Sequence, residues 1–146
     1  KMKTNTSSDL LNEFKQIVLR HEKALTDSLK LDLTLREMQL LYVLNLLQKN
    51  KNNTSTVLAI KLNVSPSAVS IMINKLEGKG YVKRNYTQTD RRKTALVLLE
   101  KSDLPINRYT NHFFKLDQLL ASNYSQNQIN SFYSILKSIE DFNSKT

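Results

Sequence analysis

The chain has 146 residues, 40% of them hydrophobic, which is enough for one domain with a buried core or for one domain plus a dimerisation element. Its formal net charge of +9 favours a polyanionic partner, and the absence of cysteine excludes disulfides, thiolate metal sites and thiol-based redox sensing. No run approaches the roughly 20 apolar residues that span a bilayer, and the N-terminal KMKTNTSSD has no apolar core for a signal peptide. We therefore expect a cytoplasmic protein with no membrane partner.

Two helices are predicted in the first third of the chain. Residues 9–29 have a helical hydrophobic pattern whose apolar stripe is wide enough for burial against more than one neighbour. Thr34 and Glu37 have the spacing of a capping box, which predicts the start of a second helix. That helix should end near the polar segment QKNKNN.

A helix-turn-helix is predicted next. A short helical pattern from residue 54 ends at Asn63, which tolerates the left-handed turn conformation. Ser65 is a good N-cap for the following helix, and Pro66 suits its first position because the missing N–H costs nothing there. Gly80 ends this helix. Two short helices joined by a tight turn are typical of a helix-turn-helix.

The second of these helices has two different faces. Val69, Ile73 and Leu76 recur at steps of four and three, so they should share a buried face. The residues predicted to point outward are mainly polar: Ser67, Ser70, Ile71, Asn74 and Lys75.

A basic hairpin is predicted after this helix. Residues 81–86 and 94–99 are rich in strand-forming residues and flank the polar segment TQTDRRK. Residues 75–101 hold eight lysines and arginines against three acids, and this clustering is what phosphate contacts require.

The last third of the chain is predicted to form two more helices. Ser102 or Asp103 can cap a long helix, and Ser125 with Gln128 makes a capping box for the final one. The final helix carries a narrow, heptad-like apolar seam, so we expect the terminal helices to build a symmetric homodimer. The alternative is that they pack within one chain on the first helix. The expected dimerisation residues are Leu10, Phe14, Ile17, Ile129, Phe132, Leu136 and Ile139.

In their order along the chain, these features resemble the MarR (multiple-antibiotic-resistance regulator) family of winged helix-turn-helix transcriptional regulators. The similar segments are LTLREMQLL at 33–41, the Leu58–Ala59 pair, SPSAVSIMINKLEGKGYV at 65–82, and DRR at 90–92. Asn63 departs from the glycine that is common there, and the usual threonine and glycine after the wing are replaced by Leu99 and Ser102. These departures concern local turns and capping more than DNA binding.

The resemblance implies a mainly α (α+β) fold. A winged helix-turn-helix DNA-binding domain would occupy residues 34–101, and residues 1–33 and 102–146 would form a helical dimerisation region. It also implies a homodimeric regulator of transcription, a repressor, that binds double-stranded DNA at a pseudo-palindromic operator. The half-sites of such an operator lie about 34–36 Å apart.

The resemblance also implies roles for particular residues. Ser67, Ser70, Ile71 and Asn74 would face base edges in the major groove, although Ile71 could instead belong to the core. Arg91 and Arg92 would enter the minor groove, with Asp90 orienting an arginine. For each position the alternative is a solvated surface. The expected phosphate contacts are Ser65, Lys75, Lys83, Arg84 and Lys93.

Family members commonly release DNA when a small molecule or a metal enters the cleft beside the DNA-binding lobe. The residues that could line such an effector pocket here are His21, Tyr42, Tyr109 and Phe113, although aromatic residues at this spacing are more often core. His21 and Glu22 are adjacent and would point about 100° apart on a helix, while His112 and Asp117 are five apart. We therefore expect no metal site and no cofactor.

Two other classes of function were compared with this interpretation. An enzyme is not expected, because Gly78 and Gly80 form no phosphate-binding loop and no Ser/His/Asp set has a recognisable spacing. A winged helix that docks an acidic protein partner through its basic face is the remaining alternative. The polar face of the second short helix and the DRR segment argue against it.

Overall fold

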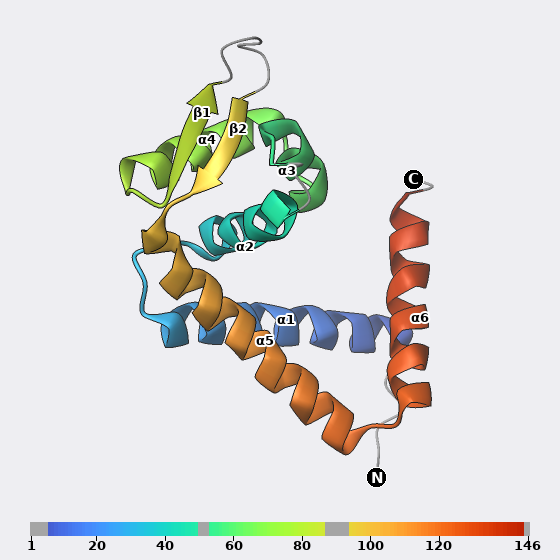
Figure 1. Cartoon of the computed structure of the whole chain (residues 1–146). Helices are drawn as coiled ribbons and strands as arrows, with labels where there is room; N and C mark the ends of the chain where they lie inside the picture. Colours follow the sequence, from blue (N-terminus) through green and yellow to red (C-terminus); the bar gives the residue numbers. More distant parts are fainter. Residues whose placement is uncertain (1–5, 50–52, 87–93, 145–146) are drawn as a thin grey trace. The chain divides into compact units, whose positions relative to one another are not determined.

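The structure, a computed structural model, describes residues 6–49, 53–86 and 94–144. The chain forms two compact units, residues 1–110 and residues 111–146. The described elements are α1 (Ser7–Leu29), α2 (Leu35–Lys49), α3 (Ser55–Leu62), α4 (Pro66–Gly78), β1 (Val82–Tyr86), β2 (Thr94–Leu98), the short 3-10 helix η1 (Glu100–Ser102), α5 (Asp103–Asn123) and α6 (Gln126–Asn143) (Figure 1). The predicted mainly α fold with a winged helix-turn-helix is confirmed.

Capping side chains set the helix starts, as the sequence indicated. The backbone N–H of Thr34 donates to the Glu37 carboxylate at 2.9 Å, and the Glu37 N–H donates to the Thr34 hydroxyl at 3.2 Å. Ser125 and Gln128 make the same reciprocal pair at the start of α6. Ser102 behaves differently: it is buried, lies in η1, and donates its hydroxyl to the Leu99 carbonyl.

The first unit is organised around the helix-turn-helix. Asn63 ends α3 in the predicted left-handed conformation with φ of 51°, and Gly80, predicted to end the next helix, follows α4 with φ of 78°. The core lies between α2, α3, α4 and β2. Its fully buried side chains include Leu40, Leu41, Leu44, Leu58, Val69, Ile73, Leu76 and Leu96.

The hairpin is anchored to the preceding loop. In the antiparallel pair, Val82 lies opposite Leu98 and Tyr86 opposite Thr94. Asn53, between α2 and α3, accepts the Leu96 N–H at 2.9 Å and donates its side-chain amide to the Leu96 carbonyl at 2.7 Å. This contact holds β2 against the helix-turn-helix.

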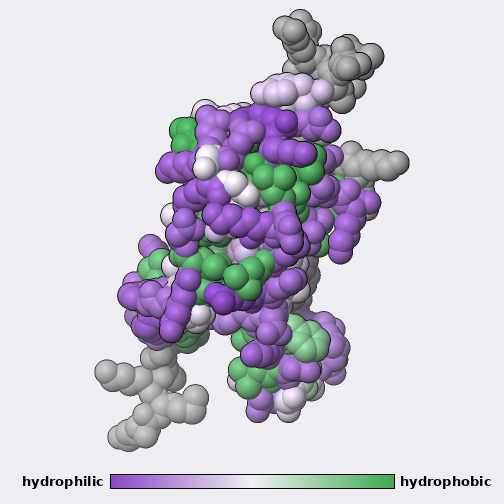
Figure 2. All heavy atoms as spheres, turned by 60° about the vertical axis from the view of Figure 1, so that its left-hand side comes forward, coloured by the Kyte–Doolittle hydropathy of each residue, from purple (hydrophilic) through white to green (hydrophobic). Residues whose placement is uncertain are grey.

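The second unit contains the end of α5 and all of α6. Several large hydrophobic side chains of this unit are exposed, among them Leu119, Phe132, Tyr133, Ile135 and Phe142. On the face shown in Figure 2 the surface is mainly hydrophilic, with hydrophobic residues in separate patches.

Within the described part of the chain, no single helix has the length and hydropathy needed to cross a bilayer. Helices α3 and α4 reach those values only when taken together, and they are bent by 111° at the turn between them. The central apolar residues of this pair, Leu58, Val69 and Ile73, are buried in the core of the first unit.

Candidate nucleic-acid interface

Helix α4 is fixed in place by its N-cap and its buried face. The Ser65 hydroxyl accepts the Ala68 N–H at 3.2 Å, and Pro66 occupies the first helical position, both as predicted. Val69, Ile73 and Leu76 have no exposed surface. Because all three lie on one side of the helix, the opposite side is presented to solvent.

The exposed face of α4 has the residues that the sequence indicated. Ser67, Ser70, Asn74 and Lys75 are all exposed, and the Ser65 and Ser67 hydroxyls lie 3.0 Å apart at the N-terminal end. Ile71 is 57% exposed, so the alternative that it belongs to the core is wrong. We name this set of residues the α4 face: Ser65, Ser67, Ser70, Ile71, Asn74 and Lys75.

The basic residues of the hairpin differ in their surroundings. Lys83 is exposed on β1. The next residue, Arg84, forms an ion pair with Glu77 and donates to the side-chain oxygen of Asn74 at 2.7 Å. Its guanidinium therefore already has two protein partners on α4. Asp90, Arg91, Arg92 and Lys93 lie outside the described residues.

The C-terminal end of α4 is held by a polar cluster that the sequence analysis missed. The Lys79 ammonium lies 3.2 Å from the carboxylate of Glu37, a residue only 3% exposed, and also donates to the Asp32 carbonyl. The Tyr81 hydroxyl donates to the Asp32 carboxylate at 3.1 Å. Lys101 donates to the Lys79 carbonyl at 2.8 Å and lies over the Tyr81 ring.

This cluster connects the end of α4 to the start of α2. Burial, and then the hydrogen bond to Asp32, raise the pKa of the Tyr81 phenol above its usual value. The signal available in the sequence was the charge of Asp32, Glu37 and Lys79, but Lys79 lies more than 40 residues from both acids, so nothing indicated that they pair.

Two of the residues proposed for an effector pocket, Tyr42 and Tyr109, are in contact. The Tyr42 and Tyr109 rings lie 5.2 Å apart and are tilted by 46°, and Tyr109 is 7% exposed. Burial is the main cause of the raised pKa of Tyr109. His21 is half-buried in α1, and Phe113 belongs to the second unit, where its ring meets His112 edge-on at 5.5 Å. Among the described residues, no three potential metal ligands gather at one place.

The expected dimerisation residues lie in both units. In the first unit, Leu10, Phe14 and Ile17 are 56%, 36% and 51% exposed, so α1 presents an apolar stripe. In the second unit, Phe132 is 51% exposed and Ile129, Leu136 and Ile139 are half-buried.

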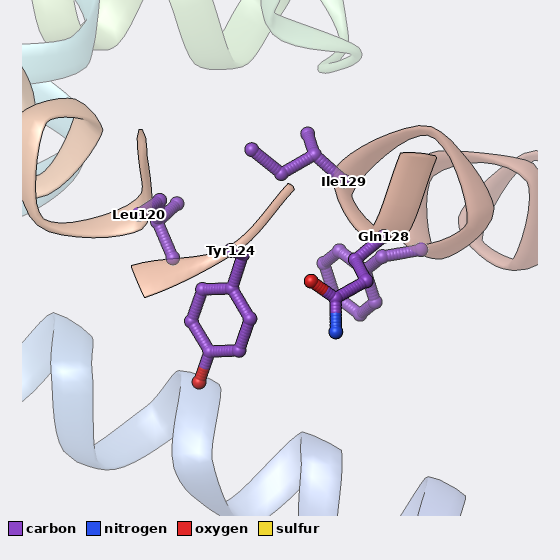
Figure 3. A pocket seen from close by; sticks show the side chains of 5 residues that line it. Leu120, Tyr124, Gln128 and Ile129 are labelled. Atoms are coloured by element: carbon purple, nitrogen blue, oxygen red, sulfur yellow. The ribbon is translucent and has the colours of Figure 1, made fainter. Parts of the chain in front are cut away.

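The second unit also contains a hydrophobic pocket of about 450 Å³ between the end of α5 and the start of α6. Leu120 and Tyr124 line it from one side and Gln128 and Ile129 from the other (Figure 3). An exposed apolar pocket of this kind is typical of a surface that is covered by a partner.

The model of the MarR family matches residues 33–94, whereas a search of curated protein sequences found no match. Three solved structures are similar over nearly the whole chain. The complex of FabT from Streptococcus pneumoniae with DNA has 23% identity and a TM-score of 0.72, and the similarity covers 93% of each chain.

The other two structures are also complexes with DNA. The MepR–DNA complex from Staphylococcus aureus has 20% identity and a TM-score of 0.78, with 94% of this chain and 98% of that chain covered. A mutant MarR from E. coli with operator DNA has 21% identity and a TM-score of 0.68, with 88% of this chain and 92% of that chain covered. The chain therefore matches the MarR-family model over residues 33–94, and it shares its fold with FabT, MepR and MarR.

Proposed function

We propose that this protein is a transcriptional regulator, a repressor, that binds double-stranded DNA sequence-specifically as a homodimer on a pseudo-palindromic operator. The observation that carries the proposal is the α4 face. Its polar residues are exposed on a helix whose opposite side, formed by Val69, Ile73 and Leu76, is fully buried. A protruding helix of this kind fits the major groove, where serine and asparagine can bond to base edges.

The charge distribution supports the same function. The α4 face and the adjacent strand β1 present Lys75 and Lys83 to solvent, in a chain of net charge +9. Exposed lysines next to a groove-reading helix are suited to phosphate contacts. The DNA complexes of FabT, MepR and MarR, whose fold this chain shares, further support DNA as the partner.

The homodimer is supported by the apolar surfaces. The α1 stripe and the pocket of the second unit leave hydrophobic side chains in contact with water, which a partner would bury. A two-fold dimer would also present two copies of the α4 face to one DNA duplex. Release by a small-molecule effector stays a prediction.

The test is selection of bound duplexes from a random DNA library, followed by fluorescence anisotropy at several salt concentrations. We expect a pseudo-palindromic motif and an affinity that falls steeply with salt, since phosphate contacts release counterions. Ser70→Glu should abolish binding by placing a negative charge on the α4 face. Ser122→Glu, at an exposed serine of α5, is the matched control and should bind as the parent does.

A different outcome would refute DNA binding. If no duplex is enriched while polyglutamate binds with a comparable salt dependence, the surface docks an acidic protein partner instead.

A further inference from the structure

Three side chains join α4 to the first strand of the hairpin. Glu77 and Asn74 lie one helical turn apart on α4, and both contact Arg84 of β1. One Glu77 oxygen accepts the Arg84 backbone N–H at 3.0 Å, and the other pairs with the guanidinium. The Arg84 side chain is 21% exposed and that of Glu77 37%. The backbone bond fixes the Glu77 carboxylate beside the guanidinium, and the charge-assisted pair with that carboxylate holds the guanidinium in one orientation.

The fixed guanidinium decides how the Asn74 amide is turned. An arginine side chain can only donate hydrogen bonds, so the Asn74 atom at 2.7 Å from it must be the carbonyl oxygen. Turning the amide by 180° would place two donors against each other. The NH2 group of Asn74 is therefore directed away from Arg84, and no described residue accepts a hydrogen bond from it.

This orientation gives Asn74 a defined chemistry toward DNA. Guanine, adenine and thymine all carry acceptors on their major-groove edges, whereas cytosine presents only the N4 donor there. We propose that Arg84 is a positioning residue that fixes Asn74 as a hydrogen-bond donor, so that Asn74 selects an acceptor-bearing base and rejects cytosine. This inference rests on the proposed DNA-binding function, and it differs from the phosphate contact that the sequence suggested for Arg84.

The experiment measures base preference and salt dependence for matched variants. In the parent, placing cytosine at the base that faces Asn74 should weaken binding roughly tenfold, within the range of a good base contact. The operator position that faces Asn74 is identified as the one at which the base preference disappears in the Asn74→Ala variant. In Asn74→Asp the amide donor becomes an acceptor, so the preference at this position should move to cytosine.

Arg84→Gln separates positioning from phosphate binding. Without Arg84 the Asn74 amide can turn its oxygen toward cytosine N4, so discrimination against cytosine at this one position should fall at least about fivefold. The base preferences at the other operator positions should stay unchanged. Lys83→Gln, at the neighbouring exposed residue, is the matched control. It should weaken all sequences alike and lower the salt slope by roughly one per protomer. If Arg84→Gln instead behaves as Lys83→Gln does, the inference is overturned.

A change in the DNA repeats the test with the parent protein, so that folding of a variant is not at issue. At an operator position with adenine opposite Asn74, replacing adenine N7, the only major-groove acceptor of that base, by carbon should weaken binding several-fold for the parent. The Asn74→Ala variant should not distinguish the two duplexes. Equal losses for both proteins would contradict the donor role while leaving DNA binding itself intact. Failure of the parent to select any duplex would instead overturn the proposed function, and this inference with it.

Discussion

The ion pair between Lys79 and Glu37 gives the sharpest prediction about stability. The Glu37 side chain is 4% exposed and that of Lys79 32%, with 3.2 Å between the ammonium and the carboxylate. Exposed pairs contribute about 0–1 kcal/mol, while removing one partner of a fully buried pair costs about 3–5 kcal/mol. Because Lys79 is partly solvated and Glu37 keeps the Thr34 N–H, we expect an intermediate value.

Lys79→Met should therefore lower the free energy of unfolding by about 2 kcal/mol. The measurement is urea denaturation followed by circular dichroism, at one fixed protein concentration because the stability of a dimer depends on concentration. Lys75→Met is the matched control, since Lys75 lies one turn earlier on α4 and is exposed. Its effect should stay within about 0.5 kcal/mol.

Two results would show that the reasoning is wrong. The first is a loss in Lys79→Met no larger than that in Lys75→Met. The second is additivity in the double variant. We expect Lys79→Met and Glu37→Gln together to lower the free energy of unfolding by less than the sum of the two single losses, the difference being about 1 kcal/mol or more, because each change breaks the same pair. Simple addition would mean that the two side chains do not interact.

Three further predictions follow from the fold. Gly80→Ala should lower the free energy of unfolding by about 1 kcal/mol through its positive φ alone, since an added Cβ meets nothing within 4 Å. Gly78→Ala, with the same open space but inside α4, should leave the free energy of unfolding unchanged or raise it by up to about 1 kcal/mol, as measured by urea denaturation. Because the pKa of Tyr81 is raised in the folded state, the unfolded chain loses this proton first, so stability should fall as pH rises above about 10; Tyr81→Phe should flatten that fall in a denaturation series at pH 9 to 11. Ile17→Glu should halve the mass in sedimentation equilibrium, whereas Ile60→Glu, at a 74% exposed residue of α3, should leave it unchanged.

The local structure of this protein could be predicted from its sequence. Capping pairs such as Thr34 with Glu37 act over three residues, so their spacing alone predicted where helices begin. The 3.6-residue period placed Val69, Ile73 and Leu76 inside and Asn74 outside, as the structure has them.

Only the tertiary structure decided which side chains meet across elements. The sequence suggested a phosphate contact for Arg84, and the hairpin brings its side chain against Glu77 and Asn74 on α4. Lys79 and Glu37 are likewise separated by 42 residues. Such pairs depend on how strands and helices pack, which periodicity along one element does not encode. The sequence by itself therefore determined which surface of α4 is exposed to solvent, and the packing of β1 on α4 decided which hydrogen-bonding groups that surface presents.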